Sequence, residues 1–414
     1  MPIIKKQYFD AVVLGAGVTG SATAIMLKQA GLSVALVDEK KSLTDYKLMC
    51  THFVQPFANQ VFHDIGVSRL LDPDHSVRTK AQFRVPGGQI DTDRGYGSDL
   101  VTAYAHNLER RVMDPALRAR AKELGVELWF GTRAKKLSDL GDYHAMLVNT
   151  PDGPVELLCE HLVAADGRSS WLAGQSDMPV TKTPNERAAY FVYCRGIDAP
   201  AKNRSIYSVT DQETSVLYPL IDGRTLLSAY VSRDTSAIWG RGHSAMQHLV
   251  SHFKDKMPDI SFKDLCADTP VYSYERFDNQ VRGPIHADIA FVGDSAVSID
   301  PMSAVGCSFG LKSAQIYVQS ILAHKGDRTA GLATYKLGFD AFFAEHIEQI
   351  SSGSLIERTS GVTANKFAPI LADHDLQQQY LDLSARLITP SEFQESYDRS
   401  VAWSVETMAL QNAA

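Results

Sequence analysis

The sequence predicts an α/β fold, α+β overall, in which a parallel-sheet domain is interrupted by an antiparallel sheet and followed by C-terminal helices. Three observations predict this fold. Residues 8 to 48 read as strand, glycine-rich turn, helix and second strand. Strand-like runs separated by turns fill about residues 188 to 274, and an apolar strand returns at 289 to 292. Helical patterns dominate from residue 308 onward.

The first apolar strand, residues 11 to 14, runs directly into a turn with three glycines. The first glycine allows a sharp turn, the second leaves room for a pyrophosphate, and the third lets the next helix pack on the strand. That helix, about residues 18 to 30, offers free N–H groups and its positive dipole end to phosphates. This is a Rossmann-like nucleotide site, and its predicted contacts are Gly15, Ala16, Gly17, Val18, Thr19 and Gly20.

An acidic residue follows the second strand, residues 34 to 37. Asp38 stands at the spacing where a carboxylate accepts hydrogen bonds from the ribose hydroxyls of a dinucleotide, and Glu39 is the alternative. Strand, glycines, helix, strand and acid thus occur in the order that a dinucleotide site requires.

A second segment, Asp166-Gly167, follows the predicted strand at 161 to 165. Ligands of open α/β sheets sit at the C-terminal ends of the strands, which is where Asp166 stands.

A third segment, Gly293-Asp294, follows the strand at 289 to 292 and precedes a helix beginning near Gly306. A carboxylate at Asp294 can hold the ribityl hydroxyls of a flavin, and Pro301 would fix the loop beside the ring. N–H groups at the helix start would stabilise negative charge on a reduced flavin. The order and spacing of the three segments therefore favour FAD over NAD as the bound nucleotide.

The remaining patterns place further elements between these segments. A helix is expected over 107 to 124, a strand over 126 to 130, a hairpin around Asp152-Gly153, and a helix around 244 to 256. We expect an FAD-binding domain of residues 1–180 and 275–325, an inserted antiparallel-sheet substrate domain of 181–274, and a C-terminal helical region of 326–414.

Composition excludes several classes of function. The 414 residues carry a net charge of −7 and a pI near 6.0, which gives no reason to expect a nucleic-acid partner. No apolar run approaches the roughly 18 residues needed to span a bilayer, and the N-terminus lacks a signal-peptide core, so we expect a cytoplasmic protein. The five cysteines are scattered without a C-x-x-C pair, which argues against a metal site.

The glycine turn, Asp166-Gly167 and Gly293-Asp294 together resemble the motif set of the flavoprotein aromatic-hydroxylase superfamily, over about residues 8 to 325. This group includes FAD-dependent monooxygenases, flavin-dependent halogenases and geranylgeranyl-reductase-like enzymes. The run Arg110-Arg111-Val112-Met113-Asp114 is similar to the family's R-x-x-L-D, which implies that Arg110, or its competitor Arg111, contacts FAD. Ala134 falls where the family pairs backbone groups with adenine.

Two departures narrow the choice within the superfamily. The histidine that usually follows G-D in aromatic hydroxylases is absent from Gly293-Asp294-Ser295-Ala296-Val297. The run Ile299-Asp300-Pro301 looks closer to the I-D-P loop of halogenases, but the W-x-W-x-I-P signature is missing. Lys80 is the local counterpart for the lysine that halogenases need, and a solvated surface lysine is the alternative reading.

The segment after the second strand runs along the flavin in this superfamily. His52 could hydrogen-bond flavin or substrate and shuttle a proton, or it could be structural. Cys50 resembles the cysteine of geranylgeranyl-reductase-like members, although the glycines that normally follow it are missing.

The resemblance implies an FAD-dependent monooxygenase that hydroxylates or epoxidises an aromatic or electron-rich substrate through a flavin C(4a)-hydroperoxide. The alternatives are a halogenase, a geranylgeranyl-reductase-like enzyme, or a flavoprotein working in complex with a carrier or peptide partner. Electrons would come from NAD(P)H or a separate flavin reductase. We expect a small-molecule substrate, either free or bound to a carrier or peptide, lying between the antiparallel sheet and the flavin under the C-terminal helices. The sequence leaves the oligomeric state open.

Overall fold

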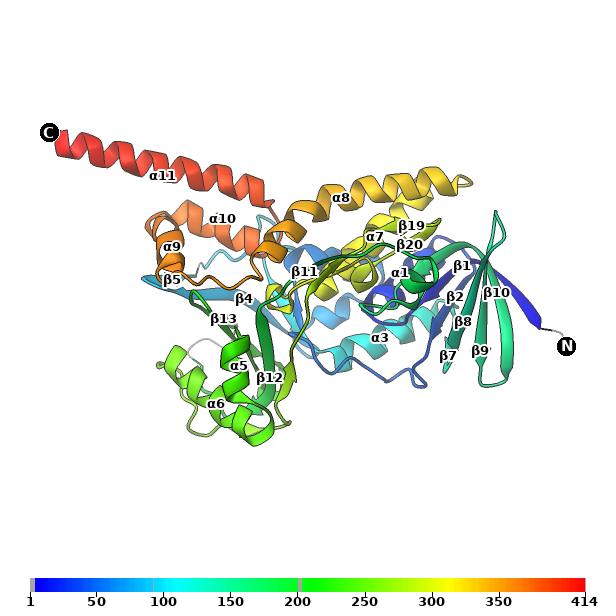
Figure 1. The fold of residues 1–414 in the computed structure, drawn as a ribbon, viewed down its shortest axis with the longest axis horizontal. Helices are drawn as coiled ribbons and strands as arrows, with labels where there is room; N and C mark the ends of the chain where they lie inside the picture. The colour runs from blue at the N-terminus through cyan, green and yellow to red at the C-terminus, as the bar shows by residue number, and fades with distance from the viewer. Residues whose placement is uncertain (1–3, 92, 200–202, 414) are drawn as a thin grey trace.

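The computed structural model describes residues 4–91, 93–199 and 203–413 and confirms the mixed α/β architecture (Figure 1). Two large sheets lie side by side, each covered by helices. The first sheet consists of β1 Lys5–Leu14, β2 Val34–Asp38, β7 Glu127–Phe130, β8 Arg133–Asp139, β9 His144–Thr150, β10 Gly153–Ala164, β19 Ile285–His286 and β20 Ile289–Phe291.

The centre of the first sheet is parallel. Its order is β19-β20-β10-β1-β2-β7, with β9 paired to β10 and β8 paired to β9. β1 pairs in parallel with β2 and β10, and β10 pairs in parallel with β20. The carboxyl ends of these four strands therefore meet at one edge, where all three motif segments begin.

Helices α1 Val18–Gln29, α3 Arg110–Glu123, α7 Gly306–Ala323 and α8 Arg328–Ser352 cover the first sheet and share its apolar core. The predicted helices at 18 to 30, 107 to 124 and 308 to 324 are thus confirmed within a few residues. The Tyr335 hydroxyl of α8 donates to the Phe291 carbonyl at 2.7 Å. α8 therefore packs with the first sheet, although it lies in the expected C-terminal region.

The second sheet is larger than the sequence predicts. Its order is β16-β12-β15-β14-β13-β4-β6-β3, with β17 on β12 and β5 on β4. The strands are β3 Phe53–Val54, β4 Ser76–Val85, β5 Gly88–Ile90, β6 Ala105–Leu108, β12 Arg187–Arg195, β13 Arg204–Val209, β14 Thr214–Pro219, β15 Thr225–Ser232, β16 Cys266–Ala267 and β17 Tyr272–Tyr274.

Strands β3 to β6 come from residues that we expected to belong to the first domain. β4 joins β13 in parallel, whereas the other pairs in this sheet that the structure describes are antiparallel. β4 was missed because Arg78, Lys80 and Arg84 give it the composition of a surface segment. In the fold these cations have partners, as Arg84 shows by its bidentate pair with Asp259. The expected limit at residue 181 does not enclose the whole sheet.

Helices cover both faces of the second sheet (Figure 1). α5 Arg233–Trp239 and α6 Gly242–Lys256 pack on one face, which confirms the helix expected around 244 to 256. α9 Val362–Ala372, α10 His374–Ser384 and the start of α11 Pro390–Ala413 pack on the other. The shorter helices are α2 Asn59–Asp64 and α4 Trp171–Gln175, with 3₁₀ turns η1 Pro56–Ala58, η2 Ser68–Leu71, η3 Ile221–Gly223, η4 Gly293–Ser295 and η5 Pro301–Ser303.

A small sheet of β11 Thr181–Thr183, β18 Asn279–Val281 and β21 Val297–Ser298 joins the two large ones. Across this junction Arg187 of β12 donates to the buried Asp300 carboxylate at 2.7 Å and to the Gly353 carbonyl at 2.6 Å. Asp300 also caps η5 through the Met302 N–H. One ion pair thus ties the second sheet, the loop after β21 and the end of α8 together.

None of the helices in the described residues is both long and apolar enough to pass through a membrane.

Loss of the Arg187 side chain is expected to destabilise the protein strongly. Arg187→Met leaves the Asp300 carboxylate buried without its cation, which costs about 3–5 kcal/mol. The matched double change Arg187→Met with Asp300→Asn removes the uncompensated charge and should recover part of that loss. Chemical denaturation of the unmodified protein and the two variants measures the free energy of unfolding. Equal values would show that the junction does not depend on the Arg187–Asp300 pair.

Candidate functional site

A cavity of about 720 Å³ opens where the first sheet's strand ends face the second sheet. It runs from the glycine turn to a set of aromatic side chains on the second sheet and its loops. Ten of the predicted cofactor residues line it: Gly15, Gly17, Val18, Thr19, Asp38, Arg110, Asp166, Asp294, Pro301 and Gly306. The three motif segments are therefore walls of one cavity, although their individual cofactor contacts remain predictions.

The glycine turn has the geometry that a dinucleotide requires. Gly15 has a φ of +103°, and a Cβ there would collide with the Ala165 carbonyl. A Cβ on Gly20 would collide with the Gly15 carbonyl, so these two glycines are needed for the fold itself. Gly17 differs, because no atom lies within 4 Å of a Cβ built there. Gly17 also precedes α1 without a side-chain cap, which leaves the helix N–H groups for a phosphate.

Asp38 is held against the glycine turn. Its Oδ2 accepts the Ala16 N–H at 2.6 Å, and its Oδ1 accepts the Lys40 N–H at 2.8 Å. A carboxylate has about four acceptor positions, so each oxygen keeps one for a ribose hydroxyl. Glu39 instead faces Arg133 in an exposed ion pair, outside the residues that line the cavity. Asp38 is therefore the better placed of the two acids.

The third segment brings a carboxylate and a helix N-terminus to the same wall. α7 begins at Gly306 without a side-chain cap, so its first N–H groups face the cavity side of the turn. Asp294 lies 3.7 Å from the Lys47 ammonium, which raises the pKa of Lys47. Gly293 does not line the cavity, and it packs against the Thr19 side chain with a φ of +61°.

The second segment contributes a buried acid and a cation. Asp166 Oδ2 accepts the Leu172 N–H at 3.1 Å, while its Oδ1 is buried without a hydrogen-bond partner in the described structure. Burial raises the pKa of Asp166. Arg168 beside it donates to the Asp278 carbonyl and to Ser298, which fixes its guanidinium at the cavity wall. These walls fit the phosphate, ribose and ring of FAD.

The structure distinguishes Arg110 from Arg111. Arg110 lines the cavity and makes a buried pair with Asp114 one turn along α3, at 2.5 and 2.9 Å. Arg111 points the other way, to Glu109 and Asp222. Ala134 lies in β8 opposite Val148 and does not line the cavity.

His52 is held in a structural network rather than facing the cavity. The Arg110 N–H donates to its Nδ1 at 3.1 Å, so Nδ1 carries no proton and Nε2 donates to the Tyr193 hydroxyl. Tyr193 in turn donates to the Leu48 carbonyl at 3.1 Å. His52 is 3% exposed and has a φ of +62°. It therefore shapes the segment that carries Cys50.

Lys80 also lies away from the cavity. Its ammonium donates to the Asp93 carbonyl and stands 5.3 Å from the centre of the Tyr104 ring. Burial lowers the pKa of Lys80. It is absent from the cavity lining, so a lysine relay to a substrate in this cavity cannot run through it.

Two further groups of lining residues carry no recognisable motif. The far end of the cavity is formed by apolar and aromatic side chains: Met49, Phe53, Phe191, Tyr274 and Phe277. Between this end and the glycine turn lie Cys50 and Cys307, whose sulfur atoms are 4.0 Å apart. The lining residues extend up to Phe309, so none of them belongs to α8, α9, α10 or α11.

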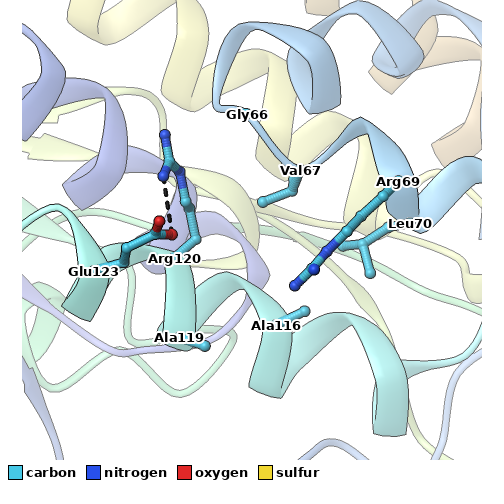
Figure 2. A pocket seen from close by; sticks show the side chains of 8 residues that line it. All are labelled: Gly66, Val67, Arg69, Leu70, Ala116, Ala119, Arg120 and Glu123. Atoms are coloured by element: carbon cyan, nitrogen blue, oxygen red, sulfur yellow. Dashed lines mark hydrogen bonds and ion pairs between the residues drawn. The ribbon is translucent and has the colours of Figure 1, made fainter.

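Another hollow, of about 270 Å³, lies between α3 and the turn that precedes η2 (Figure 2). Arg69 and Arg120 flank it, and Arg120 is paired with Glu123. It shares no lining residue with the large cavity and is too small for a dinucleotide. The large cavity is therefore the candidate site.

Comparisons with known proteins agree with this geometry. The family model described as an FAD binding domain matches residues 8–225, which contain the glycine turn, Asp38, Arg110 and Asp166. The expected flavoprotein superfamily is thereby confirmed.

Two relatives are reductases by name. Menaquinone reductase of Mycobacterium tuberculosis is 22% identical over 74% of this chain and 75% of its own length. Digeranylgeranylglycerophospholipid reductase 2 of Methanothermobacter thermautotrophicus is 24% identical over 74% of this chain and 76% of its own.

Among solved structures, p-nitrophenol 4-monooxygenase PnpA of Pseudomonas putida has the same fold. The TM-score is 0.73 at 15% identity, covering 94% of this chain and all of the other.

Substitution at Gly17 is expected to separate cofactor binding from folding. Gly17 has an extended backbone with φ of −75° and free space around its Cβ position, so Gly17→Val should fold normally. Its methyl groups would occupy the pyrophosphate path and weaken FAD binding at least about 100-fold, or about 2.7 kcal/mol. Fluorescence titration with FAD and thermal unfolding measure the two effects.

Two other glycines provide the controls. Gly174→Ala, also in free space, should change neither property, whereas Gly20→Ala should impair folding itself. Retention of full FAD affinity in folded Gly17→Val would contradict the assignment of the turn.

Loss of the His52 ring is expected to affect stability rather than proton transfer. His52→Asn suits the left-handed backbone but leaves the Arg110 N–H unpaired, at about 1–3 kcal/mol. Tyr193→Phe removes the other partner and should have a similar effect. Denaturation curves and the pH dependence of turnover test this, and loss of an ionisation near neutral pH with unchanged stability would identify His52 as a proton shuttle.

Proposed function

We propose, because the chain belongs to the family of FAD-binding domains, that it is an FAD-dependent reductase adding hydrogen across a carbon–carbon double bond of an apolar, isoprenoid-like substrate. The observation that carries this proposal is the thiol pair, Cys50 and Cys307, at the junction between the nucleotide end and the apolar end of one cavity. The chain is an FAD-dependent oxidoreductase, and we propose the direction of its reaction.

The apolar end of the cavity fits the substrate class. Met49, Phe53, Phe191 and Phe277 offer hydrocarbon and ring surface, and Tyr274 at 40% exposure stands toward solvent. Burying an apolar chain there gains about 25 cal/mol for each Å² removed from water.

Hydrogenation of a double bond needs one hydride and one proton. Bound FAD supplies the hydride from its reduced ring. The chain's own residues have to position the double bond, exclude water and deliver the proton. Cys50 and Cys307 are the thiols that line this cavity, whereas His52 is committed to Tyr193 and Arg110. The pKa of the Cys307 thiol is raised by its hydrogen bond to Cys50 and by burial, so this thiol keeps its proton and is proposed to protonate the substrate carbon.

The relatives support the same direction. The two reductases named above cover three quarters of this chain, and their names specify a prenylated quinone and a geranylgeranyl lipid. The electrons would come from NAD(P)H or a separate flavin reductase, and photoreduction replaces either source in the assay below.

Oxygenation of an aromatic substrate is the second candidate. The ring-lined cavity would suit an aromatic compound, and the fold is shared with p-nitrophenol 4-monooxygenase. Two thiols beside the site weigh against it, because activated oxygen species oxidise accessible thiolates. Halogenation is the least supported, since Lys80 lies outside the cavity.

An anaerobic half-reaction distinguishes the two candidates. Photoreduced holoprotein mixed with a geranylgeranyl lipid, which has no reducible quinone ring, is expected to reoxidise its flavin without oxygen and to yield a product heavier by two hydrogen atoms. Flavin absorbance follows the reoxidation, and mass spectrometry measures the mass of the product. Stable reduced flavin under these conditions, with incorporation of labelled oxygen into an aromatic compound in air, would establish oxygenation instead.

Replacement of Cys307 tests the proton source. Cys307→Ser should lower the rate of product formation by roughly 100-fold, the usual contribution of a positioned acid, while FAD binding and flavin reduction stay normal. Cys266→Ser, at an exposed cysteine on β16, is the matched control and should behave as the unmodified protein. Full activity in Cys307→Ser would remove the thiol from the mechanism.

A further inference from the structure

The two cavity cysteines come from distant parts of the chain. Cys50 lies before β3 and Cys307 in the first turn of α7, 257 residues later, yet their sulfur atoms are 4.0 Å apart. Both are free and half-buried, and both line the cavity, so a small molecule in the cavity reaches them. The other three cysteines differ, since Cys159 and Cys194 are buried and Cys266 is exposed on the surface.

The surroundings make the two sulfurs unequal. The Cys50 sulfur accepts the His52 N–H at 3.3 Å, and the hydrogen bond from Cys307, together with His52, lowers the pKa of the Cys50 thiol well below its usual range. Arg110 Nη1 lies 3.8 Å from the Cys307 sulfur. The pKa of Cys307 is raised by its hydrogen bond to Cys50 and by burial. Cys50 therefore has the character of an attacking thiolate and Cys307 that of a resolving thiol.

We propose that Cys50 and Cys307 form a redox-active pair that hydrogen peroxide, or another hydroperoxide of similar size, converts reversibly into a disulfide across the cavity. The sulfur atoms lie 4.0 Å apart and would have to approach to the bonding distance of about 2.05 Å. Arg110 stabilises negative charge on either sulfur during the exchange, and Asp114 holds that guanidinium in place.

The chemistry balances in two steps. The Cys50 thiolate attacks one peroxide oxygen and breaks the O–O bond, giving a sulfenic acid and hydroxide that takes the Cys307 proton to form water. The Cys307 thiolate then attacks the Cys50 sulfur and displaces hydroxide, which is protonated to a second water. Two thiols lose two electrons and two protons, and one peroxide is reduced to two waters.

The disulfide would change the site as well as the thiols. It would link the segment after β2 to the start of α7, both of which line the cavity. It would also remove both thiol protons, and in this respect it rests on the proposed reductase function. Formation of the bond itself does not depend on that function.

The test uses the full-length holoprotein, reduced, freed of reductant and treated with one equivalent of hydrogen peroxide. Alkylation after denaturation, followed by peptide mapping, should show a Cys50–Cys307 linked peptide and loss of two of the five thiols. Dithiothreitol should restore all five. Cys50→Ser and Cys307→Ser should each abolish the link, whereas Cys266→Ser should leave it unchanged.

Other outcomes would overturn the proposal. These are sulfinic acid at Cys50 without a linked peptide, links that involve only Cys266 between chains, or five intact thiols after treatment. The readout on the unmodified chain does not depend on whether the serine variants fold. A linked peptide in a protein without reductase activity would uphold the redox pair and reject the proposed function, so the two failures are distinguishable.

Discussion

The site depends on close backbone approaches that only glycine permits. The Thr19 side chain in the first turn of α1 packs against Gly293 and Gly310, and a Cβ at either position would collide with its hydroxyl. Gly15 lies against the Ala165 carbonyl in the same way. Each motif segment thus touches another through a glycine, and α1 and α7 bring their uncapped N-termini to one cavity. Side chains at these positions would separate the walls that a dinucleotide must contact together.

The parts of the fold set by local pattern were predictable. The glycine turn, α1, β2 and the hairpin of β9 and β10 follow from short-range periodicity and turn residues. β4 was not, because its pairing with β13 joins residues 80 and 204, and its cations read as solvent-exposed until their partners are known. The same limit applies to α8, which continues a helical pattern toward the C-terminus but is fixed to the first sheet by Tyr335 and the Phe291 carbonyl.

The roles of the site residues likewise depend on partners that the local sequence does not reveal. Arg110 is held at the cavity by the Asp114 carboxylate, one turn further along α3. Arg111 instead pairs with Asp222, which does not line the cavity. No sequence signal marks His52 as structural, since its partner Tyr193 is 141 residues away. The positive φ at His52 is a strained conformation for a side chain of this size, and the hydrogen bonds to Arg110 and Tyr193 offset its cost. That strain directs the His52 N–H to the Cys50 sulfur.

The position of Cys50 and Cys307 would make the proposed reduction sensitive to oxygen. Bound FAD would supply peroxide when oxygen competes with the substrate, and Cys50 and Cys307 line the cavity from which that peroxide would leave. If the pair closes as proposed, the proton source disappears when oxygen competes with the substrate, and turnover stops until a thiol reductant returns. An oxygenating enzyme would gain nothing from this arrangement, because its own oxidant would attack the pair. The thiols therefore favour a reductive reaction for the same physical reason that they make it sensitive to oxidation.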